Sequence, residues 1–318
     1  MRKTTAMQVK TIRYQPQGGA HLIDIDVGEP GPGQVQVEGT ACGICAWDLQ
    51  TFKAGTDQGY AAPPGHEGVG YISKLGEGVE GIEVGQKVAG GGFARLRNMA
   101  VDRLYLLPDS KLEDKHWIVE PVSCVITGID HCQLQAGDRV ALIGAGFMGL
   151  MILQGLAGSY ADQIIALDVE DSRLELAQRL GATESYNTRL DNFADIAADL
   201  QQRGIDTTID TTGAQAALDL AGEITQRGGR INLFGWIKGQ QAHFNPSQWH
   251  LKGLSIVNSA PGSKLRDPYP AAIRLLASGK IDLRQLVTHT VPLAEYPDFM
   301  QAVTSGEVKG YIKGVVEL

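Results

Sequence analysis

The chain has few cysteines and no long apolar run, and each shortage excludes a class of protein. Its 318 residues include four cysteines, which do not form the disulfide framework of a small secreted domain. No apolar stretch approaches the roughly 20 residues that cross a bilayer. The basic start lacks the apolar segment that a signal peptide would have next. We therefore predict a cytoplasmic protein with no membrane partner.

Positive charge is also in short supply. Lysine and arginine number 28 against 36 acidic residues, which gives a net charge of -8. Such a balance argues against non-specific binding to nucleic acid, so no nucleic-acid partner is expected. The apolar and charged fractions, 43% and 20%, are ordinary for a globular protein. The length predicts about two domains.

Glycine is the residue in excess, with 40 copies that punctuate short apolar runs. Up to about residue 118, alternating or apolar segments bounded by glycine and proline predict strands. The clearest are 22–27, 34–38, 69–72 and 87–89. Helical periodicity is weak in this part of the chain. We predict a β-barrel-like first domain.

From about residue 122, buried strands alternate with helices, which predicts a parallel sheet with helices on both faces. The expected strands are 139–143, 163–168, 207–210, 230–234 and 254–257. The tail, with a helix around 271–278 and a strand at 287–292, is expected to rejoin the first domain. The predicted division is therefore 1–121 and 266–318 for one domain, and 122–265 for an inserted nucleotide-binding domain.

A glycine-rich turn opens the inserted domain. Gly144, Gly146 and Gly149, with Phe147 and Met148 between the last two, form a GxGxxG pattern after a strand and before a helix. An acid ends the next strand about 20 residues later, as in dinucleotide-binding units. The first glycine permits a tight turn, the second admits the pyrophosphate, and the third allows close packing. A glycine-bearing turn without a ligand is the alternative.

The acid in question is Asp168, placed to accept hydrogen bonds from the hydroxyls of the adenosine ribose. Glu170 and Asp171 add negative charge that would repel a 2′-phosphate. Arg173 is the only basic residue close enough in sequence to favour that phosphate, and its helix position predicts that it faces solvent. The sequence therefore favours NAD over NADP.

Three other residues could together hold a zinc ion: Cys45, His66 and Glu120. One thiolate, one imidazole and one carboxylate leave a tetrahedral zinc with an open position, as a catalytic metal requires. Asp48, three residues after Cys45, is expected to accept the second ring N–H of His66 and so orient it. Taken singly, these residues could instead be a buried cysteine, a turn histidine and a solvated acid at a helix start.

The pair Cys42 and Cys45 also forms a CxxC pattern, which raises two other readings. A redox pair of this kind normally lies in a βαβ unit, and the first domain shows none. A thiolate zinc knuckle would need a second pair of ligands, and the spacing of Cys124 and Cys132 does not supply one. Cys42, Cys124 and Cys132 are therefore predicted to be packing residues.

Together the motifs resemble those of the zinc-dependent medium-chain alcohol dehydrogenases, and within them the polyol (sorbitol-type) branch. The similarity covers essentially the whole chain. The matching segments are Gly43-Ile44-Cys45-x-x-Asp48, Gly65-His66-Glu67-x-x-Gly70, Gly92-Phe93-Ala94, Glu120-Pro121, Gly144 to Gly149, Asp210-x-Thr212-Gly213, Gly228-Gly229-Arg230 and Gly310-Tyr-Ile-Lys313.

The resemblance implies an α/β protein with a GroES-like β-barrel catalytic domain and a Rossmann domain, a doubly wound parallel sheet. Zinc and a nicotinamide cofactor would lie in the cleft between them. Cys45, His66 and Glu120 would be the zinc ligands, with Glu67 as the acid beside the metal, either outside the ligand set or in exchange with water. Arg173 and Lys313 are placed with the cofactor-binding residues. The resemblance also implies one zinc per subunit, because the structural zinc lobe is absent, and a homodimer or homotetramer.

One departure from the family concerns the proton. The family has a serine or threonine two residues after the ligand cysteine, and this chain has Trp47. An indole N–H can donate a hydrogen bond but cannot relay a proton, so the proton is expected to leave by another route. Trp47 and Phe93 are predicted to line the substrate pocket, with a core position as an equal alternative for Phe93.

The function predicted from these features is hydride transfer from a secondary alcohol, a polyol, sugar or cyclitol, to NAD, which gives a ketone. A threonine-type dehydrogenase of the same family is the alternative. An NAD- and zinc-binding protein with little turnover is an alternative of another class. A zinc-free quinone or enoyl reductase is disfavoured, because it would not need Cys45, His66 and Glu120 together.

Overall fold

The computed structural model describes residues 6–56, 64–236 and 241–318, which form two compact units. Unit 1 contains Met1–Pro121, Leu276–Ser278 and Asp282–Leu318; unit 2 contains Val122–Leu275 and Gly279–Ile281. The first division falls at residue 121, where the sequence places it. The return to unit 1 comes at 276–282, later than the predicted 266.

Unit 1 is built mainly of strands, as expected for its glycine-punctuated sequence. Its strands are β1 (Met7–Tyr14), β2 (Ala20–Val27), β3 (Gln34–Gly43), β4 (Glu67–Leu75), β5 (Lys87–Ala89), β6 (Leu96–Ala100), β7 (Tyr105–Leu106), β14 (Val287–Pro292) and β15 (Lys313–Glu317). Its helices are α1 (Ala46–Ala54) and α9 (Tyr296–Ser305), with short 3-10 turns η1 (Val101–Arg103), η2 (Asp114–His116) and η4 (Leu293–Glu295).

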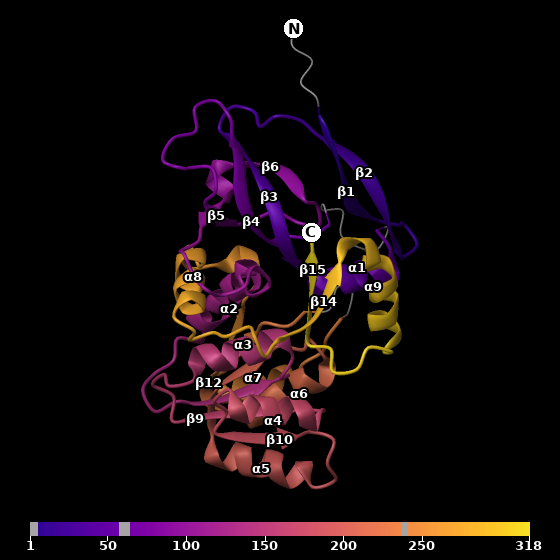
Figure 1. The fold of residues 1–318 in the computed structure, drawn as a ribbon. Coiled ribbons are helices and arrows are strands. Elements are labelled where there is room, and N and C mark those ends of the chain that lie inside the picture. Colours follow the sequence, from indigo (N-terminus) through magenta and orange to yellow (C-terminus); the bar gives the residue numbers. More distant parts are fainter. Residues whose placement is uncertain (1–5, 57–63, 237–240) are drawn as a thin grey trace. The chain divides into compact units, whose positions relative to one another are not determined.

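The main sheet of unit 1 has the order β14-β15-β3-β4-β5-β7, with β6 paired to β3, and β1 and β2 form a separate antiparallel pair (Figure 1). Strand β3 is therefore central, with the C-terminal strand β15 on one side and β4 on the other. An apolar core that includes Ile12, Ile44 and Phe93 packs against this region.

Unit 2 alternates strands and helices, as predicted for a doubly wound fold. Its strands are β8 (Arg139–Ile143), β9 (Gln163–Asp168), β10 (Glu184–Asn187), β11 (Ile205–Asp210), β12 (Thr225–Leu233) and β13 (Ser255–Asn258). Its helices are α3 (Phe147–Leu156), α4 (Asp171–Arg179), α5 (Phe193–Arg203), α6 (Gln215–Ile224) and α7 (Pro246–Lys252), with the 3-10 turn η3 (Pro261–Ser263). Helices α2 (Val119–Cys132) and α8 (Tyr269–Ala277) each span a division between the units.

The sheet of unit 2 is parallel throughout, in the order β10-β9-β8-β11-β12-β13. Strand β8 is buried over residues 140–143, and β9 over 164–168. This near-continuous burial is typical of parallel strands covered on both faces. The Rossmann-type prediction is confirmed. In the part of the chain that the structure describes, no helix is long and apolar enough to span a membrane.

Candidate active site

The end of strand β3 brings the candidate metal ligands of unit 1 together. Gly43, its last residue, pairs with Glu67 of β4 on one side and with Val315 of β15 on the other. Cys45 follows two residues later, and His66 directly precedes Glu67. Residues that are far apart in the chain thus converge at one edge of three adjacent strands.

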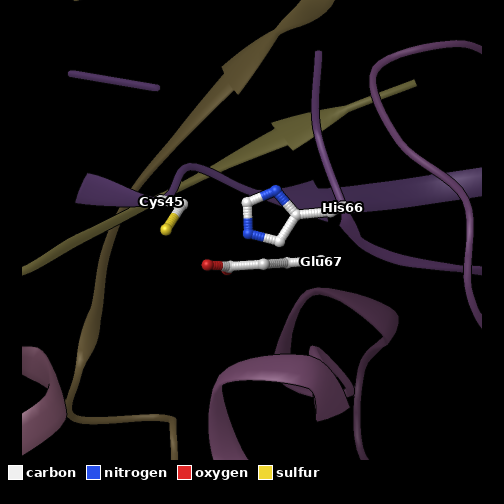
Figure 2. A group of neighbouring side chains, drawn as sticks. All are labelled: Cys45, His66 and Glu67. Carbon is white, nitrogen blue, oxygen red and sulfur yellow. The ribbon is translucent and has the colours of Figure 1, made fainter. Parts of the chain in front are cut away.

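Cys45, His66 and Glu67 each offer one donor atom, and these atoms lie within 4.8 Å of one another. Figure 2 shows the sulfur, the imidazole ring and the carboxylate grouped around a shared space. A thiolate, an imidazole and a carboxylate are the donor types that zinc prefers. The side chains therefore fit a zinc ion by their chemistry and by their proximity.

Gly43 makes room for the carboxylate of this group. A Cβ atom at Gly43 would lie 2.0 Å from Glu67 Oε2 and 3.1 Å from Lys313 Cε. Lys313 Nζ lies 2.5 Å from Glu67 Oε2, and the side chains of this ion pair are 5% and 2% exposed. Lys313, predicted from the resemblance to contact the cofactor, is thus found paired with an acid of the metal group. Its role toward the cofactor stays a prediction.

The surroundings of Cys45 disfavour the ionised, thiolate form of its side chain. Burial raises the pKa of Cys45, and the charge of Glu67 raises it further, whereas Lys313 lowers it. The residue also caps the N-terminus of α1, where the helix dipole favours negative charge. A divalent ion among these donors would stabilise the thiolate, because metal binding and thiol deprotonation are coupled.

Glu120 lies beside the group without belonging to it. Its Oε2 atom is 4.0 Å from His66 Nε2, and the two side chains are 23% and 36% exposed. It occupies the first turn of α2. Within the described residues, the set of donor atoms that lie within 4.8 Å contains Glu67 and not Glu120. The structure thus leaves two carboxylates available for the third ligand position.

Asp48 does not orient His66 as predicted. Its Oδ2 atom accepts the backbone N–H of Cys45 at 2.8 Å, and its Oδ1 atom accepts the hydroxyl of Tyr14 at 2.8 Å. No hydrogen bond joins Asp48 to His66, although the two charges interact. The reason is local: Asp48 is the third residue of α1, so its carboxylate folds back onto the helix N-terminus.

Of the two predicted pocket residues, Phe93 is a core residue. Its side chain is fully buried, and its ring centroid lies 5.0 Å from that of Tyr296. A Cβ atom on Gly65 would lie 2.6 Å from the Phe93 backbone nitrogen, so Phe93 packs under the loop that carries His66. The alternative reading of Phe93 is therefore the one found. Trp47 is half-buried in the first turn of α1.

The glycine turn of unit 2 has the geometry that its sequence predicts. Gly144 has a φ of +98°, which favours glycine. A Cβ atom on Gly149 would lie 2.0 Å from the carbonyl oxygen of Gly144, so this glycine permits the helix to approach the strand. A Cβ atom on Gly146 would meet nothing within 4 Å. That open space is where a pyrophosphate would approach the N-terminus of α3. Phe147 and Met148, the first residues of α3, are half-buried.

Asp168 ends β9 beside this turn, as predicted. Its Oδ2 atom accepts the N–H of Ala145 at 2.6 Å, and its Oδ1 atom accepts the N–H groups of Val169 and Glu170. The carboxylate is thus held in place by the glycine turn and by its own loop. Arg173 is half-buried on α4, and its role in cofactor binding stays a prediction.

The other cysteines do not join the site. All four are free thiols; Cys42 and Cys132 are buried, and Cys124 is partly exposed. Cys132 donates to the carbonyl of Gly128 and accepts from Asn232. These contacts agree with the predicted packing role.

Sequence reasoning missed two residues that support the site, Tyr14 and Tyr296. Their hydroxyl oxygens are 2.6 Å apart although 282 positions separate them in the chain. No local motif could have found them, because only the fold of unit 1 brings them to Asp48.

The comparisons with known proteins agree with this architecture. Residues 31–109 match the model of the alcohol dehydrogenase GroES-like domain, and residues 148–278 match that of the zinc-binding dehydrogenases. A sorbitol dehydrogenase from Bacillus subtilis (strain 168) is 28% identical over 84% of this chain and 86% of its own. An L-threonine 3-dehydrogenase from Legionella pneumophila (strain Philadelphia 1) is 26% identical over 93% and 96%. The crystal structure of 2R,3R-butanediol dehydrogenase from Bacillus subtilis has a TM-score of 0.83 at 24% identity, over 98% of this chain and 99% of the other.

The two family models match both parts of the predicted architecture. Of the three predicted ligands, the structure brings Cys45 and His66 together, with Glu67 rather than Glu120 as the acid of the group. The chain belongs to the zinc-dependent medium-chain alcohol dehydrogenases.

Proposed function

We propose that this protein is a zinc- and NAD-dependent dehydrogenase that oxidises a secondary alcohol, a polyol, sugar or cyclitol, to a ketone. The observation that carries the proposal is the convergence of Cys45, His66 and Glu67 within 4.8 Å. The glycine turn of unit 2, with open space at Gly146, supports a dinucleotide as the hydride acceptor.

The residues suited to hold zinc are Cys45, His66 and one of the two acids, Glu120 or Glu67. When bound, zinc acts as a Lewis acid on the substrate oxygen, and NAD accepts the hydride. The protein's own part is to hold these donors in place and to compensate their charge. Lys313 compensates the charge of Glu67, which is buried and would otherwise carry an unpaired charge.

Trp47 affects how a proton leaves this site. The side chain at this position lacks the hydroxyl that family members use as a relay, and its indole N–H only donates. A proton from the substrate therefore leaves by another route, through water beside Glu67 or through the cofactor ribose.

The metal role is tested by Cys45→Ser, with Cys132→Ser as a matched control. We expect Cys45→Ser to lose bound zinc and turnover together, because it removes the soft ligand. Cys132→Ser should keep both, since Cys132 is buried in unit 2 and a serine hydroxyl can still donate to Gly128. Elemental analysis and reduced-NAD absorbance measure the two quantities. Turnover that survived complete metal loss would refute the assignment.

The preference for NAD rests on Asp168 and the acids that follow it. A carboxylate has about four acceptor sites, so Asp168 can bind ribose hydroxyls while it holds the N–H groups of its own loop. The double change Asp168→Ser and Val169→Arg should shift the ratio of kcat/KM toward NADP, because it exchanges a repulsive charge for an attractive one. An unchanged ratio would count against the role of Asp168.

The substrate class is supported by relatives that act on different alcohols. Their printed names include sorbitol, butanediol and L-threonine dehydrogenases. A panel of polyols, vicinal diols and L-threonine, followed by reduced-NAD absorbance at alkaline pH, separates a polyol enzyme from a threonine enzyme. A protein that bound zinc and NAD but reduced no cofactor with any secondary alcohol would belong to the alternative, non-catalytic class.

We also propose a homo-oligomer. Strand β13 forms an edge of the unit 2 sheet, and Ile256 on it is 43% exposed. An exposed edge strand offers unpaired backbone groups to a second copy. Light scattering during size-exclusion chromatography tests this. The cytoplasmic location stays a prediction of the sequence.

A further inference from the structure

Behind the metal group of unit 1 lies a chain of buried polar contacts that the proposed chemistry does not use. It runs from Tyr296 on α9 to Tyr14 on β1, then to Asp48 on α1, and ends at the backbone N–H of Cys45. The contacts measure 2.6, 2.8 and 2.8 Å in that order. The three side chains are 0%, 8% and 5% exposed.

The direction of this chain follows from which groups have protons. The Cys45 N–H can only donate, and an ionised carboxylate can only accept. The single hydroxyl proton of Tyr14 is therefore committed to Asp48 Oδ1. It follows that Tyr14 accepts in its contact with Tyr296, and that Tyr296 donates.

The cost of this arrangement indicates that it has a use. Both tyrosines belong to an apolar core with Ile12 and Ile44. A buried carboxylate in such surroundings is unfavourable, and apolar residues of similar size would fill the space at lower cost. What the polar chain supplies is a fixed position for Asp48, whose two oxygens accept from the buried Tyr14 hydroxyl and from the partly buried Cys45 N–H.

We propose that Tyr14 is a positioning residue for the candidate zinc ligand Cys45. It acts through Asp48: the Tyr14 hydroxyl fixes one carboxylate oxygen, and the other oxygen fixes the Cys45 backbone at the start of α1. The direction of the Cys45 Sγ atom toward His66 and Glu67 depends on that backbone. Tyr296 donates to Tyr14 and so affects Cys45 only through Tyr14. The inference rests on the proposed metal site and adds to it the residues that preorganise the thiolate.

The one-way direction predicts unequal effects for two otherwise identical substitutions. Tyr14→Phe leaves Asp48 Oδ1 without its donor and leaves the Tyr296 hydroxyl without its acceptor. Tyr296→Phe keeps the bond from Tyr14 to Asp48 intact. The double variant should therefore bind metal as weakly as Tyr14→Phe alone, because the effect of Tyr296 passes through Tyr14.

The test uses metal-free full-length protein titrated with Co²⁺, followed by the absorption band of the thiolate–cobalt bond. We expect Tyr14→Phe to raise the Kd for Co²⁺ about 10- to 100-fold, the usual effect of losing an outer partner of a metal ligand, and to alter the band. Tyr296→Phe should have a smaller effect. Tyr71→Phe is the matched control: it removes a tyrosine–aspartate bond of the same unit, from Tyr71 to Asp114, and should bind Co²⁺ as the unchanged protein does.

The outcomes distinguish a failure of the proposed metal site from a failure of the positioning role of Tyr14. If the unchanged protein shows no thiolate band, the metal site fails and this proposal fails with it. If the band is present and Tyr14→Phe binds Co²⁺ with unchanged affinity, the positioning role alone is overturned. Additive losses in the double variant would also overturn it. Should Tyr14→Phe fail to fold, Asp48→Ala serves instead, since it removes both oxygens that accept from Tyr14 and Cys45; unchanged Co²⁺ affinity in that variant would overturn the role.

Discussion

At the scale of single residues, the absence of a side chain at Gly43 allows Glu67 and Lys313 to form a buried ion pair. With no Cβ at this position, the carboxylate of Glu67 and the stem of Lys313 meet over the backbone of β3. A buried ion pair adds little net stability, but removing one partner leaves an uncompensated charge. Lys313 thus supplies the counter-charge of Glu67 and holds its carboxylate in place beside Cys45 and His66.

We predict that Lys313→Met lowers the free energy of unfolding of the metal-free protein by about 3–5 kcal/mol, because it strands the Glu67 carboxylate in the interior. The double variant Lys313→Met and Glu67→Gln should recover much of the loss, since no buried charge then remains. Urea denaturation measures both.

The control is Lys115→Met, which breaks the ion pair with Glu113, whose side chain is 67% exposed. Exposed pairs contribute about 0–1 kcal/mol. A loss in Lys313→Met no larger than in this control would show that Glu67 does not depend on Lys313 for charge compensation.

Cys45, His66 and Glu120 could be recognised from the sequence as candidate zinc ligands, because each lies in a short local motif. Which acid joins the first two could not. That depends on the register of β3 against β4, which sets Glu67 opposite Gly43, and on a lysine 246 positions away from Glu67 in the chain. The second partner of Asp48, Tyr14, was hidden for the same reason.

At the scale of elements, the three glycines of the turn between β8 and α3 serve three purposes. Gly144 supplies a positive φ, Gly149 supplies close packing, and Gly146 supplies space that the protein itself leaves open. At Gly146 φ is -78°, a value that other residues adopt readily. The fold itself therefore does not require glycine at this position, and we infer that the open space serves a ligand.

This distinction makes a paired prediction. Gly146→Ala should leave the melting temperature nearly unchanged and weaken NADH binding at least about tenfold, because its methyl group occupies the pyrophosphate space. Gly149→Ala should lower the melting temperature, because its Cβ would lie 2.0 Å from a carbonyl oxygen. Thermal unfolding and NADH fluorescence titration separate the two effects. Normal NADH affinity in Gly146→Ala would place the cofactor elsewhere.

The elements that the sequence predicted best are those buried on both faces. Strands β8 and β9 are continuous apolar runs, and their predicted bounds agree with the structure. Strand β10, with the sequence Glu184-Ser-Tyr-Asn, is half-buried at the sheet edge and has no such run. It was not predicted, because an edge strand with one exposed face lacks the apolar signal.

At the scale of the whole molecule, the two units differ in how the chain builds them. Unit 2 is nearly continuous, and all the strands that the structure describes in its sheet lie within 122–281. The predicted boundary at 266 was too early because the chain stays with unit 2 for longer: Ile281 approaches Gly155 of α3, and Lys280 bonds the carbonyl of Ala157. Unit 1 instead needs both ends of the chain, since β15 pairs with β3.

A fragment of residues 122–281 should therefore fold by itself. It contains all six strands of its sheet and the core around Ile165, Leu200 and Ile231, so it should unfold cooperatively and bind NADH through the glycine turn. Residues 1–121 alone lack β14, α9 and β15, and with these elements Tyr296 of α9 and Lys313 of β15. Glu67 therefore loses its counter-ion and β3 loses a neighbour. That fragment should neither unfold cooperatively nor bind Co²⁺ through Cys45. Circular dichroism during urea unfolding distinguishes the two fragments. A cooperative transition in 1–121 would mean that unit 1 folds without its C-terminal strands. In that case Glu67 would not depend on Lys313 as its buried counter-ion.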